Sequence, residues 1–202
     1  MDDDIKPTQE DFDNTIYDLE SEIGIPKGFC FNLKDEDGWS FIIKLQALID
    51  AAVTHLLTHS INKPELEGVI TRLELGNSTN GKLAFIKKLD LLNESERRLV
   101  KTICEIRNDF VHNISNTGKT LSDYLAQNEK ERIIKSVIAY LDNEDVKKKD
   151  VIDNSVYYFL RSGIKLLRII YLQKYSAEME NKITQRQIQI TNEVAGFPPS
   201  RE

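Results

Sequence analysis

The chain places an arginine, an amide and a histidine within one hexapeptide, from Arg107 to His112. An arginine side chain presents a fixed fork of donors that matches a phosphate group, and it stays charged. A histidine side chain takes and returns a proton near neutral pH. Arg107 and His112 together therefore suit cleavage of a phosphodiester without a metal or cofactor.

The spacing of Arg107 and His112 restricts how their side chains meet. On an ideal helix, residues five apart point about 140° away from each other. Either the helix ends near Phe110 and His112 turns back on looser backbone, or two copies of the chain pool their residues at a symmetric interface. A purely structural role also fits. Arg107 would then pair with an acid such as Glu105 or Asp109, and His112 would cap the helix end, where a cation is favoured.

The segment before the motif has the pattern of an amphipathic helix. Leu99, Ile103 and Phe110 recur at helical spacing and give it one apolar face. Asn93 is in the position of an N-cap, and Glu96, three residues later, completes a capping box. We therefore expect a helix that begins after Asn93 and carries the motif near its end.

Apolar periodicity of the helical kind extends through most of the chain. It predicts a short helix at 8–23, a long core helix at 39–59, and short helices at 65–74 and 82–89 on either side of a turn at 76–81. It further predicts one helix or two at 121–141, a charged connector at 143–150, and a long helix from 152 to about 189. Residues 24–38 are predicted to form a loop with a short extended piece at 29–33.

These elements predict an all-α protein, a helical bundle with a long C-terminal helix. The expected organisation is an acidic N-terminal arm over residues 1–36, with a short helix and a loop, followed by the bundle over 37–142. The long helix of 143–195 is expected to pack on the bundle or at a dimer interface, and 196–202 to form a loose tail. Scarce glycine (9) and proline (5) disfavour a turn-rich all-β fold.

Charge is distributed unevenly along the chain. The formal net charge is −6, but residues 1–22 hold nine acids against Lys6 alone, so the remainder carries +2. The overall acidity is therefore only a weak argument against a nucleic-acid partner. No apolar run predicts a bilayer span, and Cys30 and Cys104 lie in apolar contexts that favour core packing over a disulfide framework. We expect a cytoplasmic protein with no membrane partner.

Three other patterns suggest chemistry but fit structural roles better. His55 and His59 share a helix face at a spacing that can chelate zinc, yet no third ligand is evident. Gly76 to Lys82 has the glycine and lysine spacing of a phosphate loop, but Leu83 stands where Ser or Thr should hold magnesium. The third pattern combines basic and tyrosine side chains. The lysines at 147–149 suit a solvated connector better than an RNA contact. The tyrosines of the last helix suit helix packing better than base stacking; they are Tyr157, Tyr158, Tyr171 and Tyr175.

Residues 39–114 resemble the HEPN superfamily, and within it the mannitol-operon-repressor-like branch. The matching features are the long apolar helix 39–59, the Leu-rich segment ending in the Gly-rich turn 72–81, the segment 82–92, and Ile106 to His112, which has the family's Arg-polar-x-x-x-His pattern. The resemblance covers somewhat over a third of the chain, and residues 120–195 have no clear counterpart.

The resemblance implies an all-α fold, frequent dimerisation, and often a metal-independent endoribonuclease that acts as a toxin or phage-defence effector. Arg107 and His112 would be the catalytic pair, Asn108 would orient the arginine, and the product would be a 2′,3′-cyclic phosphate. The expected partners are RNA and a second copy of the chain. Two alternatives remain: a non-catalytic regulatory protein of the mannitol-repressor-like type, and an immunity or antitoxin protein that binds a protein partner. No helix-turn-helix with a basic recognition helix is evident, which disfavours operator binding.

Overall fold

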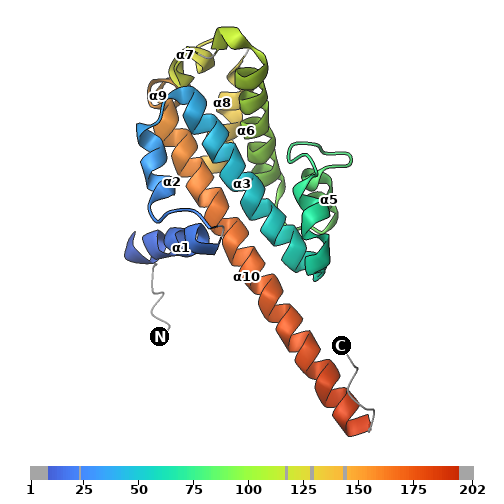
Figure 1. The fold of residues 1–202 in the computed structure, drawn as a ribbon. Coiled ribbons are helices and arrows are strands. Elements are labelled where there is room, and N and C mark those ends of the chain that lie inside the picture. Colours follow the sequence, from blue (N-terminus) through green and yellow to red (C-terminus); the bar gives the residue numbers. More distant parts are fainter. Residues whose placement is uncertain (1–8, 23, 117, 128–129, 143–144, 196–202) are drawn as a thin grey trace.

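The computed structural model describes residues 9–22, 24–116, 118–127, 130–142 and 145–195, and within these ranges every regular element is a helix. The elements form the expected all-α bundle with a long C-terminal helix, which extends well past the rest of the molecule (Figure 1). One apolar core runs from Ile16 to Ile170. The predicted loose tail and the first eight residues of the acidic arm lie outside the described residues.

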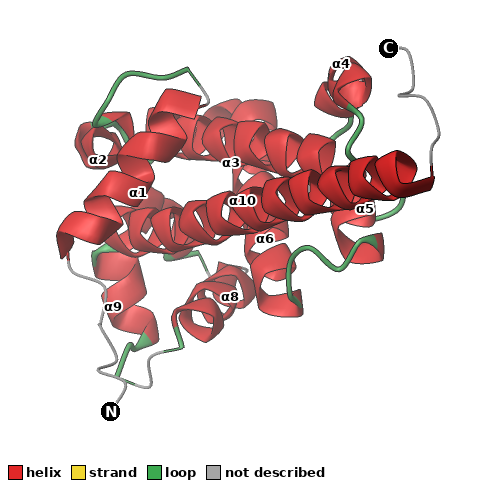
Figure 2. Ribbon diagram, turned by 90° about the horizontal axis from the view of Figure 1, so that it is seen from below, coloured by secondary structure: helices red, strands yellow, loops and turns green. Residues whose placement is uncertain are grey.

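Two helices form the centre of the bundle. Helix α3 (Gly38–Ile61) begins at Asp37, whose carboxylate accepts hydrogen bonds from the backbone of the first turn, and its apolar side chains fill the core. Helix α10 (Ser155–Ala195) packs lengthwise against α3 (Figure 2). By length and hydropathy α3 meets the criterion for a bilayer span, which the sequence analysis did not expect, but 61% of its apolar window is buried inside the bundle.

The motif helix, α6 (Glu94–His112), forms as its sequence predicts. Asn93 and Glu96 make the predicted capping box, with each side chain accepting a hydrogen bond from the backbone N–H of the other residue. The predicted apolar face is buried. Through this face α6 packs on α3 and on α8 (Glu131–Leu141).

The N-terminal region departs from prediction at residues 29–33. The expected extended piece is instead a helical turn, α2 (Phe29–Asn32), followed by the 3-10 turn η1 (Leu33–Asp35). The reason is a long-range cap: the buried Glu20 of α1 (Gln9–Glu22) accepts hydrogen bonds from the backbone N–H groups of Gly28 (2.5 Å) and Cys30 (2.7 Å). A carboxylate at this position satisfies the free N–H groups of a helix start.

The remaining helices follow the predicted order with shifted boundaries. Between α3 and α6 lie the 3-10 turn η2 (Pro64–Leu66), α4 (Glu67–Thr71) and α5 (Lys82–Lys88). After α6 and the 3-10 turn η3 (Ile114–Asn116), residues 121–141 contain two helices, α7 (Leu121–Leu125) and α8. The predicted connector continues into helix α9 (Lys148–Asp153), and the predicted long helix is interrupted at Asn154 before α10 begins.

Candidate functional site

The motif residues occupy the last turns of α6 in different environments. The helix continues through His112, so the expectation that it ends near Phe110 is wrong. The roughly 140° rotation between positions 107 and 112 therefore holds. Arg107 is half-buried, whereas His112 is exposed. Within one chain, the side chains of Arg107 and His112 therefore do not converge on a single phosphate. A site that uses both residues would have to combine Arg107 of one copy with His112 of another.

Arg107 is supported by its neighbour and not by an acid. Its Nη1 donates to Oδ1 of Asn108 at 3.1 Å. Its Nε is buried and has no hydrogen-bond partner in the described part of the chain. A buried donor without an acceptor is costly, and Ser60, Tyr140 and Ser162 also have such atoms in the described part of the chain. The acids next to Arg107 in the motif helix pair with other cations, and among the described residues no ion pair engages its guanidinium.

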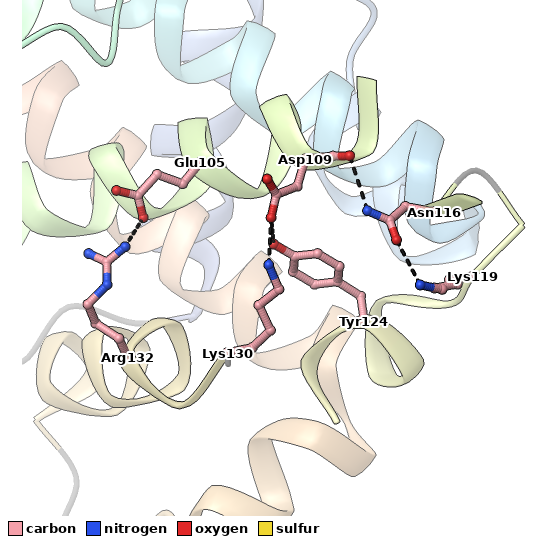
Figure 3. A network of polar contacts seen from close by, with 7 residues as sticks. All are labelled: Glu105, Asp109, Asn116, Lys119, Tyr124, Lys130 and Arg132. Atoms are coloured by element: carbon pink, nitrogen blue, oxygen red, sulfur yellow. Dashed lines mark hydrogen bonds and ion pairs between the residues drawn. The ribbon is translucent and has the colours of Figure 1, made fainter. Parts of the chain in front are cut away.

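The acids that were expected to compete for Arg107 are bound elsewhere (Figure 3). Asp109 Oδ2 accepts from the Tyr124 hydroxyl and from Lys130 Nζ, both at 2.6 Å. Glu105 Oε2 lies 2.5 Å from Arg132 Nη2 on α8. Burial raises the pKa of the Asp109 carboxyl, but the bonds from Lys130 and Tyr124 outweigh it and the net pKa is lowered. Asp109 therefore stays ionised and holds α7 and α8 against the motif helix.

A second set of bonds fixes the chain just after His112. Asn116 Nδ2 donates to the backbone carbonyl of Asp109 at 3.2 Å, and Lys119 Nζ donates to Asn116 Oδ1 at 2.8 Å (Figure 3). The Asp109 carbonyl also accepts the backbone N–H of Asn113, so the Asn116 side chain ties the following turn to the end of the helix. The result is a rigid end of α6 from which His112 extends into solvent.

An open groove of about 1090 Å³ lies between α5, α6 and α8. Six of its lining residues are cations and two, Glu94 and Glu131, are acids. The cations are Lys87, Arg97, Arg98, Lys101, Arg132 and Lys135. Ion pairs within the chain engage Arg98, Arg132 and Lys135, but among the described residues Lys87 and Lys101 have none. The groove therefore carries an excess of positive charge that the protein itself does not neutralise.

Two groove residues of α6 share one helix face with Asn108 and His112, whereas Arg107 lies off this face. Arg97, Lys101, Asn108 and His112 advance by four, seven and four residues, which keeps them within an arc of about 60°. The line they make is about 22 Å long at 1.5 Å per residue. Arg97 and Lys101 were not among the predicted site residues, although their helical register with Asn108 and His112 can be read from the sequence.

The other sequence candidates have structural surroundings. His59 Nδ1 lies 3.1 Å from Glu178 Oε1, and the described residues contain no group of three or more potential metal ligands. Lys82 is fully buried, with Nζ 2.5 Å from Asp50 Oδ1, so it is not available to a nucleotide phosphate. Both cysteines are buried and free, and burial raises the pKa of the Cys104 thiol to about 12.

Comparisons of the chain with models of protein families, with curated proteins and with solved structures find no match.

Proposed function

We propose that the chain is a metal-independent endoribonuclease of the HEPN kind, which binds RNA along the α5–α6–α8 groove. The observation that carries this proposal is the single face of α6 that holds Arg97, Lys101, Asn108 and His112, on which the intervening Glu105 is neutralised by Arg132. Cations along a groove attract a phosphate backbone whatever its base sequence. A strand that follows this face passes from the basic groove to the only motif side chain that acts as a general base.

The chemistry assigns one task to each motif residue. His112 removes the proton from a ribose 2′-hydroxyl, and the 2′-oxygen attacks the adjacent phosphorus. The bond from phosphorus to the 5′-oxygen breaks, and the leaving oxygen takes up a proton, which gives a 2′,3′-cyclic phosphate and a 5′-hydroxyl. Arg107, whose side chain is partly exposed, stabilises the charge that develops on the phosphate oxygens.

The two residues act together only when two copies meet over the end of α6. In one chain the side chains of Arg107 and His112 point to different sides of the helix. Two-fold pairing would bring His112 of one copy toward the partner's Arg107, twice per dimer. A toxin or defence effector is the role that such an enzyme would have.

The direct test is RNA cleavage in EDTA by the wild type, by His112→Ala and by Arg107→Ala. We expect the wild type to cleave and both variants to lose 10²-fold or more of the rate, since general acid–base catalysis contributes about 10²–10⁴. His55→Ala is the matched control, because His55 lies on α3 and outside the motif. A folded wild type that cleaves no RNA would move the assignment to the non-catalytic regulatory or immunity alternative.

Mixing the two inactive variants tests whether the site is shared. A mixed dimer of Arg107→Ala and His112→Ala retains one intact pair if the residues act across the interface, so an equilibrated mixture recovers about a quarter of the wild-type activity. No recovery from two dimeric variants would contradict pooling and would require both residues to act from one chain.

A further inference from the structure

The distal half of α10 has an apolar face that no described part of the chain covers. Figure 1 shows this half extending beyond the bundle. The inner face of the helix is held as far as Asn181, whose Nδ2 donates to the backbone carbonyl of His59 at 2.9 Å. Every residue from 182 to 191 is exposed. This segment gains nothing from tertiary packing, although an isolated helix of its length is marginal in water.

Four large apolar residues form a narrow line on this exposed helix. Leu172, Met179, Ile183 and Ile190 are 51%, 41%, 54% and 47% exposed and fall within an arc of about 40°. This line, called the outer stripe below, lies on the side opposite Asn181 and therefore faces away from the bundle. An apolar face of 100° or more is typical of helices that pack on a globular core, whereas a narrower stripe is typical of a coiled-coil seam.

The outer stripe follows the heptad spacing of a coiled coil. Met179 takes a d position and Ile183 and Ile190 take a positions, with Leu172 at the preceding d position. The stripe is also symmetric about residue 181. Leu172 and Ile190 each lie nine residues from that point, and Met179 and Ile183 each lie two residues from it. A surface that reads the same in both directions is complementary to its own copy across a two-fold axis.

We propose that the outer stripe pairs with the outer stripe of a second copy in antiparallel orientation, centred on residue 181. Leu172 then packs against the partner's Ile190, and Met179 packs against the partner's Ile183. The seam is about 27 Å long. Contacts of this size bury less than the roughly 1,200 Å² of a standard interface, so the pairing is weak and reversible.

The polar positions of the seam favour the antiparallel orientation. Ser176 and Arg186 occupy the remaining a and d positions between Leu172 and Ile190. A parallel, in-register pair would place the two Arg186 guanidinium groups against each other. The antiparallel pair places each Arg186 against the small Ser176 of the partner and beside the partner's Tyr175, a ring that can accept a cation–π contact.

The pairing leaves the proposed RNA site free and does not depend on it. The inner face of α10 packs on α3, and α3 in turn packs on α6, so the outer stripe and the groove belong to different sides of the molecule. This contact does not bring His112 to a second Arg107. The antiparallel seam can therefore form whether or not the chain cleaves RNA.

Disulfide cross-linking tests orientation and register directly. We expect Leu172→Cys mixed with Ile190→Cys, on chains tagged to differ in mass, to give a covalent heterodimer on mild oxidation. Each variant alone gives at least tenfold less cross-linked product, because in the antiparallel pair identical positions 172 or 190 lie about 27 Å apart. Leu172→Cys mixed with Ile188→Cys is the control, since Ile188 is 56% exposed but lies on the opposite face. The native Cys30 and Cys104 are buried.

Sedimentation equilibrium supplies the second measurement. We expect Ile183→Asp to raise the dimer dissociation constant of this contact tenfold or more, while Ile188→Asp leaves it unchanged. Both positions are exposed, so circular dichroism should show unchanged helix content. Cross-linking of Leu172→Cys with itself would overturn the antiparallel register. No cross-linking in the mixture of Leu172→Cys with Ile190→Cys, or equal effects of the 183 and 188 substitutions, would overturn the interface.

Discussion

The carboxylate of Asp109 lies 2.6 Å from the ammonium group of Lys130, and this ion pair joins the middle of the motif to the start of α8. The Tyr124 hydroxyl donates to the same carboxylate oxygen, and Lys130 Nζ also lies 4.5 Å from the centre of the Tyr124 ring. A residue inside the Arg107–His112 motif is thus structural. It secures the helix from which the two candidate catalytic side chains extend.

Replacing Asp109 by Asn should lower stability in a pH-dependent way. The folded-state pKa of Asp109 is lowered, so its contribution is complete above the unfolded pKa of about 4 and is lost as the pH falls through the folded pKa. We expect a loss of about 1 kcal/mol at pH 7, because the pair is partly exposed. Urea unfolding at pH 7 and pH 3 measures it, with the exposed Asp18→Asn as control. A difference between wild type and Asp109→Asn that persists undiminished at pH 3 would contradict this role.

Reversing charge in the groove should weaken RNA binding without affecting folding. Lys87 and Lys101 are exposed and have no ion pair among the described residues, so their substitution by Glu breaks no internal contact. We expect the double variant to bind single-stranded RNA at least tenfold more weakly and with a shallower salt dependence, since fewer counterions are released. Filter binding over a salt series measures both. Lys88→Glu on α5, outside the groove lining, is the control, and equal losses for the two variants would argue against a specific path.

Removing the buried ammonium of Lys82 should destabilise the turn before α5. Its Nζ lies 2.5 Å from Asp50 Oδ1 and 3.3 Å from the Thr71 carbonyl, while the Asp50 side chain is 34% exposed. Because Asp50 can be partly hydrated, we expect Lys82→Met to cost about 2 kcal/mol, less than the 3–5 kcal/mol of a fully buried broken pair. Thermal unfolding beside the exposed Lys88→Met measures this. Adding Asp50→Asn to Lys82→Met should recover part of the loss, and a loss that grows instead would contradict the pairing.

The close contact of α3 and α10 depends on a glycine. A Cβ atom at Gly163 would lie 2.6 Å from Cδ1 of the buried Leu45. We expect Gly163→Ala to lower the free energy of unfolding by about 1 kcal/mol, because overpacking outweighs the gain in helix propensity. Gly68→Ala on α4 meets no atom within 4 Å and should raise stability by up to about 1 kcal/mol. Chemical denaturation of both variants measures the difference. Stabilisation by Gly163→Ala would show that α3 and α10 can move apart enough to accommodate the methyl group.

Local sequence determined the helices and the start of the motif helix. The capping box of Asn93 and Glu96 and the apolar face of α6 involve residues three or four apart, so a single segment encodes them. The supporting contact of Asn108 with Arg107 is local as well. The alignment of Arg97 and Lys101 with His112 on one side of the helix is also encoded in this segment, because helical periodicity alone determines it.

Tertiary structure decided the features that join distant residues. The carboxylate of Glu20 turned a predicted extended piece into a helix start at Gly28, a contact that no local pattern encodes. Packing also decided which charged side chains form ion pairs. Lys82 is buried and pairs with Asp50, and Asp109 pairs with Lys130. The free energy of a buried charge depends on which opposite charge the fold places beside it. Within the described residues, the Nε of Arg107 has no hydrogen-bond partner and one face of the distal half of α10 has no cover. Both are properties of the folded chain, because each depends on what the rest of the bundle places nearby.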